Sequence, residues 1–186
     1  VAMRKRCDIV GVFVLALLTS MGGSILRDGV FLQRPPPVLT DLFYLPLILA
    51  ATLLAAVFRH RIANLRVVDR LVGTIDAIGT PAFAVVGLQL ALESGIPLPG
   101  VILVGAVSGV GGGVLRDLIV REVPFILQPG QFFALVVLLA CIAFLTLTLG
   151  LQLDTARAAW ATIALFFVVR MLTIRYNWHT HPLMPD

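Results

Sequence analysis

The sequence GGSILRD at residues 22–28 returns as GGGVLRD at residues 111–117. Five of the seven positions are identical in the two copies. The same shift of 89 residues places Pro35 on Pro124, at an equal distance after each copy. The chain therefore contains an internal repeat, and each half carries consecutive glycines followed by an adjacent arginine and aspartate.

The motif stands in a chain whose composition is that of an integral membrane protein. Of the 186 residues, 59% are apolar and 13% are charged, and the mean hydropathy is +1.02. Soluble domains carry about 25% charged residues, so this composition excludes a soluble enzyme and a disordered chain. The net charge of +4 could suggest nucleic acid. The basic residues, however, stand between apolar runs, as in cytoplasmic membrane loops, so no nucleic-acid partner is expected.

Six apolar runs mark candidate membrane-spanning helices. They cover residues 9–32, 42–58, 71–92, 98–120, 132–151 and 158–174. Each is near the ~20 residues that a helix needs to cross a hydrocarbon core of ~30 Å. The runs are continuous rather than alternating, which favours helices over the strands of a barrel. The predicted fold class is an all-α integral membrane protein with six helices present in the chain.

The distribution of lysine and arginine predicts the orientation in the membrane, because cytoplasmic loops carry an excess of both. With six spans, one side receives nine of these residues and the other side two. The nine are Arg4, Lys5, Arg6, Arg59, Arg61, Arg66, Arg70, Arg121 and Arg175, and the two are Arg34 and Arg157. We therefore expect a multi-pass protein of the inner (plasma) membrane with a cytoplasmic C-terminus.

The repeat predicts how the spans are grouped. Residues 1–70 form a first repeat, 71–152 a second repeat of three spans, and 153–186 a closing helix and tail, all within one membrane domain. A repeat with an odd number of spans places its two copies in opposite orientations, an arrangement common in transport proteins. The first repeat lacks the leading helix of the second, so we expect an N-terminal helix to be missing from this chain. The repeat also argues against reading the basic start as a cleaved signal peptide.

The motif glycines are the first candidate functional residues. Glycine lowers helix stability by up to ~1 kcal/mol relative to alanine, so a run of glycines within a span requires a reason. A broken helix at matching positions of inverted halves is typical of a central pathway. The alternative is simple helix packing through small residues. The predicted pore or kink residues are Gly22, Gly23, Ser24, Gly111, Gly112 and Gly113.

The charged residues inside the runs are the second group of candidates. Arg27–Asp28 and Arg116–Asp117 follow the glycines, and a mid-membrane charge costs ~2.5–3.5 kcal/mol unless it is paired or hydrated. Adjacent helical residues point about 100° apart, which favours pairing across the two halves or to freed carbonyls. The alternative is that both pairs extend to the membrane surface. The other intramembrane polar candidates are Asp76, Thr80 and Arg170, and a salt bridge between Asp76 and Arg170 is possible.

Catalytic and metal chemistry have no clear basis in the sequence. Cys7 and Cys141 lie far apart, and the three histidines, at 60, 179 and 181, have no ligand spacing. No nucleophile stands near a matching base. We therefore expect no cofactor, no metal and no enzymatic activity.

The motifs together resemble those of a known family. The two glycine motifs, Ile75-Asp76-Ala77-Ile78-Gly79 and the closing stretch 170–178 are similar to the prokaryotic trimeric intracellular cation (TRIC) channels, also known as glycine-transporter-domain proteins. The resemblance implies seven helices, as two inverted three-helix repeats plus one. It also implies a homotrimer in the lipid bilayer, with a potassium-permeable pore in each protomer, lined by the glycine-broken helices. This chain departs from the pattern in its absent first helix and in Ser24, where the second copy has a third glycine.

Two functions from different classes remain in view. The first is a monovalent-cation (potassium) channel, which would pass current without a substrate gradient. The second is a secondary transporter of glycine or a similar small zwitterion, because the amides and carbonyls of broken helices suit a carboxylate and an ammonium group equally well. A non-conducting scaffold held by glycine packing is a third reading.

Overall fold

The computed structural model describes residues 7–58, 65–128 and 133–176, and these form helices without strands. The α-helices are α1 (Ile9–Leu26), α2 (Pro37–Thr40), α3 (Tyr44–Val57), α4 (Leu65–Glu93), α5 (Leu98–Ile119), α6 (Phe133–Leu145) and α7 (Thr155–Arg175). Two π-helical turns, η1 (Arg27–Phe31) and η3 (Thr146–Gly150), continue α1 and α6, and a short 3₁₀ turn, η2 (Phe125–Leu127), follows α5. The all-helical membrane fold expected from the sequence is confirmed.

Within the described residues, five helical segments are long and apolar enough to cross a membrane, where the sequence predicts six. They are Ile9–Phe31, Gly73–Glu93, Leu98–Ile119, Phe133–Gly150 and Thr155–Thr173. The remaining apolar helix, α3, has 14 residues. At 1.5 Å per residue that length is about 21 Å, which is less than the ~30 Å core. The apolar run extends beyond the helix because Leu42 and Phe43 precede its first turn.

The helix boundaries follow the spacing of the motif. Ile9 begins α1 and Leu98 begins α5. These two starting residues are separated by 89 residues, the same shift that superposes the two glycine motifs, and α3 and α6 follow the motifs in the same order. Equivalent segments of the two halves therefore adopt equivalent helices.

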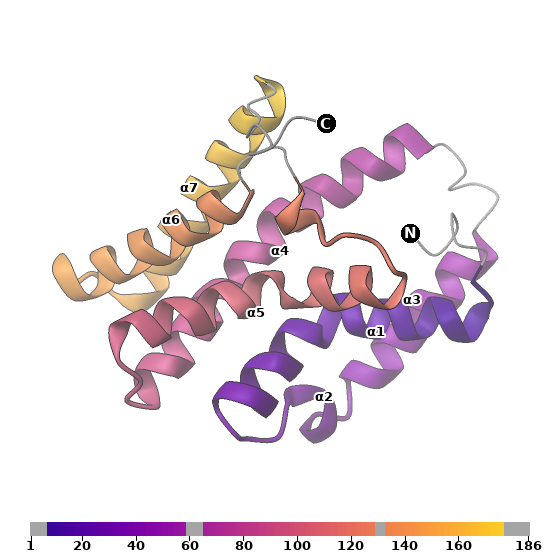
Figure 1. Ribbon diagram of the computed structural model, residues 1–186, viewed down its shortest axis with the longest axis horizontal. Coiled ribbons are helices and arrows are strands. Elements are labelled where there is room, and N and C mark those ends of the chain that lie inside the picture. Colours follow the sequence, from indigo (N-terminus) through magenta and orange to yellow (C-terminus); the bar gives the residue numbers. More distant parts are fainter. Residues whose placement is uncertain (1–6, 59–64, 129–132, 177–186) are drawn as a thin grey trace.

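The α4–α5 pair lies at the centre of the arrangement (Figure 1). Helices α6 and α7 pack on one side of this pair, and α1 with α3 packs on the other. The main core is built from apolar residues of α4, α5, α6 and α7, including the fully buried Leu88, Val101, Phe144 and Phe166. A smaller cluster around Met21, Val38 and Ile48 joins α1 to α2 and α3. The two motif helices, α1 and α5, meet between these clusters.

Candidate functional site

The motif glycines bring the backbones of α1 and α5 into direct contact. A Cβ atom on Gly22 would lie 2.9 Å from the Gly112 Cα, and one on Gly112 would lie 2.5 Å from the carbonyl oxygen of Thr19. A Cβ atom on Gly23 would overlap the carbonyl oxygen of Ser108. These distances leave no room for any side chain, so glycine is required at these positions for the two helices to approach so closely.

The helices are not interrupted at the glycines, which corrects the expectation of a break there, while a bend at these residues stays a prediction. Helix α1 continues through Gly22, Gly23 and Ser24 to Leu26, and α5 continues through its three glycines to Ile119. The missing side chains are used for backbone contact between helices, so the hydrogen bonds along each helix can remain. In α1 the irregular part follows the motif, in the π-helical turn η1, where the amide of Leu32 donates to the carbonyl of Arg27 at 2.9 Å.

The hydroxyl of Ser24 is also used within the helix. Its Oγ donates to the carbonyl oxygen of Met21 at 2.8 Å, and the residue is buried. The extra hydroxyl of the first motif is therefore satisfied by its own helix.

The first Arg–Asp pair is buried, and its two adjacent residues form an ion pair with each other. Arg27 donates from Nε to Asp28 Oδ1 at 2.9 Å and from Nη2 to Asp28 Oδ2 at 2.5 Å. Arg34 Nε donates to Asp28 Oδ1 at 2.7 Å, so two guanidinium groups share one carboxylate. Arg27 is 2% exposed and Asp28 is 0% exposed. A bidentate, doubly paired carboxylate of this kind is among the stronger charge contacts in proteins.

The second pair is more open. Arg116 Nε donates to Asp117 Oδ1 at 2.8 Å, and the backbone amide of Phe125 donates to Asp117 Oδ2 at 3.1 Å. The side chain of Arg116 is 24% exposed, whereas that of Asp117 is 5% exposed. The carboxylate thus ties the end of α5 to η2, while its arginine retains contact with solvent.

The pairing differs from the one expected from the sequence. Each arginine bonds the aspartate beside it, because the long arginine side chain can fold back over its neighbour despite the 100° between their Cβ directions. The contact across the halves is made to a hydroxyl instead, since Arg27 Nη1 donates to Ser108 Oγ on α5 at 3.4 Å. Burial of Arg27 and Asp28 inside the protein also argues against the alternative in which this pair extends to the membrane surface.

Two residues of this network were not among the sequence candidates. Ser108 is 2% exposed, accepts from Arg27 and donates to the carbonyl oxygen of Phe83 at 2.9 Å, so it connects α1, α5 and α4. The repeat contained a signal, because the shift of 89 residues places Ser108 on Thr19, another hydroxyl residue. Arg34 was counted only as a loop charge, and nothing in the spacing showed that it would reach Asp28.

The other intramembrane polar candidates lie on α4 and α7. Thr80 Oγ1 donates to Asp76 Oδ1 at 3.4 Å, and Asp76 is exposed while Thr80 is buried. Arg170 is 5% exposed, and its guanidinium lies 4.9 Å from the ring centroid of Phe133 and 5.6 Å from that of Phe125. Arg170 therefore makes cation–π contacts with both rings.

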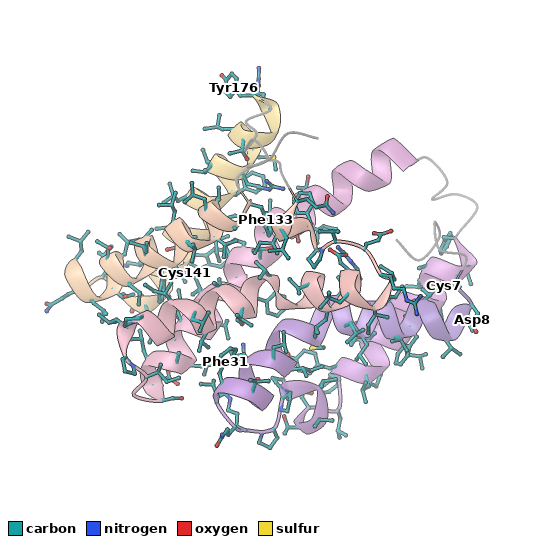
Figure 2. The ribbon with its side chains drawn as sticks, viewed as in Figure 1. Cys7, Asp8, Phe31, Phe133, Cys141 and Tyr176 are labelled. Carbon is teal, nitrogen blue, oxygen red and sulfur yellow. The ribbon has the colours of Figure 1, made fainter. Side chains whose placement is uncertain are left out.

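The structure brings no metal-binding cluster together in the residues it describes. Cys7 at the start of α1 and Cys141 within α6 are both free thiols, and Figure 2 shows them well separated. Groups of three or more histidine, cysteine, aspartate or glutamate side chains suited to a metal are absent from these parts of the chain. The three histidines lie outside the described residues.

Comparison with known proteins places the chain in a membrane protein family. The profile of the Glycine transporter family matches residues 1–60 and 74–148. A UPF0126 membrane protein of Deinococcus radiodurans is 42% identical over 122 residues, which cover 66% of this chain and 55% of that protein. The UPF0126 inner membrane protein YadS of Escherichia coli is 30% identical over 182 residues, covering 96% of this chain and 84% of YadS.

Solved structures of channels share the fold. A TRIC cation channel studied for conductance superposes with a TM-score of 0.88 at 29% identity, over 100% of this chain and 89% of the channel. The TRIC orthologue of Rhodobacter sphaeroides superposes with a TM-score of 0.83 at 29% identity, over 95% and 89% of the two chains. These relatives are channels and membrane proteins rather than enzymes, and the resemblance noted in the sequence is confirmed. The chain belongs to the Glycine transporter family and has the all-helical membrane fold of the TRIC channels.

Proposed function

We propose that this chain is a subunit of a homotrimeric monovalent-cation channel of the inner membrane, permeable to potassium. The observation that carries the proposal is the superposition of the whole chain on a TRIC cation channel, with a TM-score of 0.88 and 29% identity. A structure described as a prokaryotic TRIC channel in 0.5 M KCl also superposes, with a TM-score of 0.82 at 31% identity. An inner membrane location follows the description of the Escherichia coli relative.

The site supports a pathway beside the crossing of α1 and α5 in each protomer. Arginine in a cation pathway would repel the permeant ion, but Arg27 is ion-paired with Asp28 and Arg116 with Asp117, which reduces the repulsion. In this arrangement Arg27 joins the two crossing helices through its hydrogen bond to Ser108 of α5. Asp117, the partner of Arg116, fixes the end of α5 to η2. The two halves lie in opposite orientations in the membrane, so the two Arg–Asp pairs are near opposite ends of the path.

The test is electrical recording of the full-length protein, purified as an oligomer of measured mass and reconstituted in planar bilayers. A channel passes current in symmetric potassium chloride, and in a salt gradient its reversal potential moves toward the potassium equilibrium potential. Saturable uptake of labelled glycine into proteoliposomes without such current would contradict the proposal and favour the transporter. Bilayers that receive the detergent alone serve as the control.

A further inference from the structure

Helices α4 and α5 are tightly packed at one end of their contact and lie further apart at the other. A Cβ atom on Gly87 would lie 2.6 Å from the Ser108 Cβ, and one on Gly109 would lie 2.8 Å from the carbonyl oxygen of Thr80. One turn further along α5, a Cβ atom on Gly113 would meet nothing within 4 Å. Figure 1 shows the two ribbons diverging in this direction, toward the start of α4 and the end of α5. The close contact between the two helices therefore ends beyond Thr80 and Gly109.

Asp76 lies at the end where α4 and α5 diverge. The α4–α5 connection is short, so the helices are antiparallel, and the residue one turn before Thr80 on α4 is level with the turn after Gly109 on α5. The position of Asp76 is confirmed by its hydrogen bond from the Thr80 hydroxyl. Asp76 is an exposed residue although it stands in a segment apolar enough to span a membrane, Gly73–Glu93. A charged group at such a depth is tolerated where it faces water.

The carboxylate of Asp76 differs from the other two aspartates inside the spans. Asp28 and Asp117 each accept from an arginine within 2.8 Å, so their charges are neutralised. Asp76 accepts only from a hydroxyl among the described residues. Of the described arginines near it, Arg170 lies over two phenyl rings and Arg116 is paired with Asp117.

We propose that Asp76 attracts cations to the side of the protein where α4 and α5 diverge, and so sets the cation preference at this mouth of the pathway. The inference rests on the proposed channel function. The local charge supports it: Asp76, Arg116, Asp117 and Arg170 sum to zero, and removal of the Asp76 charge leaves one net positive charge that repels cations. A carboxylate with one hydroxyl partner among the described residues retains lone pairs for a passing monovalent cation.

The first experiment compares unitary potassium conductance of the wild-type protein with that of Asp76→Asn and Asp76→Glu in low and high salt. At about 0.05 M salt the Asn variant should conduct at least about two-fold less, and at about 1 M the difference should vanish because the Debye length falls to ~3 Å. The Glu variant should retain the wild-type conductance. Glu93→Gln, at the other end of α4, is the matched control and should change neither value.

The outcomes separate the inference from the function on which it rests. A wild-type protein without cation current contradicts the proposed function. A wild-type cation channel whose Asn variant has the same conductance at both salt concentrations overturns the role of Asp76. A reduction of equal size at low and high salt also overturns it, because that result indicates a structural effect rather than an electrostatic one.

A second experiment changes the charge after folding, in case the Asn variant fails to assemble. Asp76→Cys is prepared on a Cys7→Ser background, with Cys141 left in place because it is buried. A negatively charged methanethiosulfonate reagent should raise the low-salt conductance toward the wild-type value, and a positively charged reagent should lower it. Equal effects of the two reagents, or failure of either to react with the thiol, would overturn the proposal.

Discussion

At the residue scale, the two Arg–Asp pairs predict unequal losses of stability. Asp28→Asn leaves Arg27 buried without its counter-charge, which costs roughly 3–5 kcal/mol for a fully buried pair. Asp117→Asn should cost less, because the Arg116 side chain is 24% exposed and retains water as a partner. Thermal unfolding of the purified proteins in one detergent would measure both effects, with the wild-type protein as reference.

The comparison is informative because the two substitutions make the same chemical change at equivalent positions of the repeat. Equal losses for the two variants would contradict the difference in burial that the structure shows. Arg34→Gln supports the interpretation further: it removes one of two donors to Asp28 while Arg27 remains, so its effect should be smaller than that of Asp28→Asn.

At the scale of the helices, the crossing of α1 and α5 predicts which glycines tolerate a side chain. Gly112→Ala places a Cβ atom 2.5 Å from the Thr19 carbonyl oxygen, which forces the helices apart and should cost about 1–3 kcal/mol. Gly113→Ala meets nothing within 4 Å and should be neutral or stabilising by up to ~1 kcal/mol. Unfolding temperature and the yield of assembled protein would report both effects.

These adjacent positions form their own control, since the same substitution is made in the same helix of the same motif. A helix that needed the glycines for a break would be disturbed at both positions. Loss of stability at Gly113 equal to that at Gly112 would therefore restore the broken-helix interpretation and contradict the packing one.

At the scale of the whole molecule, the charge distribution predicts the orientation in the membrane. A cysteine replacing Arg66, on a Cys7→Ser background, should resist membrane-impermeant thiol reagents in intact cells and react after permeabilisation. A cysteine replacing the exposed Arg157, in the first turn of α7, should react from outside. Ready labelling at position 66 from outside would refute the cytoplasmic assignment and reverse the predicted topology.

Much of the fold could be predicted because the relevant signals are local in sequence. An apolar run of about 20 residues shows a spanning helix without knowledge of its neighbours, and the 89-residue shift relates segments that begin equivalent helices. The length of α3 was overestimated, because hydropathy marks apolar residues but not the turn at which the helix begins. The candidate positions were identified by the same logic, since glycines and charges are unexpected inside apolar runs.

The sequence by itself determined the membrane class, the six apolar helices and the residues at which the two halves meet. Only the tertiary structure decided what those residues do there. The glycines serve backbone contact, since the Cβ positions of Gly22 and Gly112 are occupied by the opposite helix. The partners of Asp28 and the role of Ser108 depend on how α1 crosses α5, and a crossing geometry is a property of two helices together. Spacing along one chain specifies a face of a helix, whereas partner choice depends on distances in three dimensions.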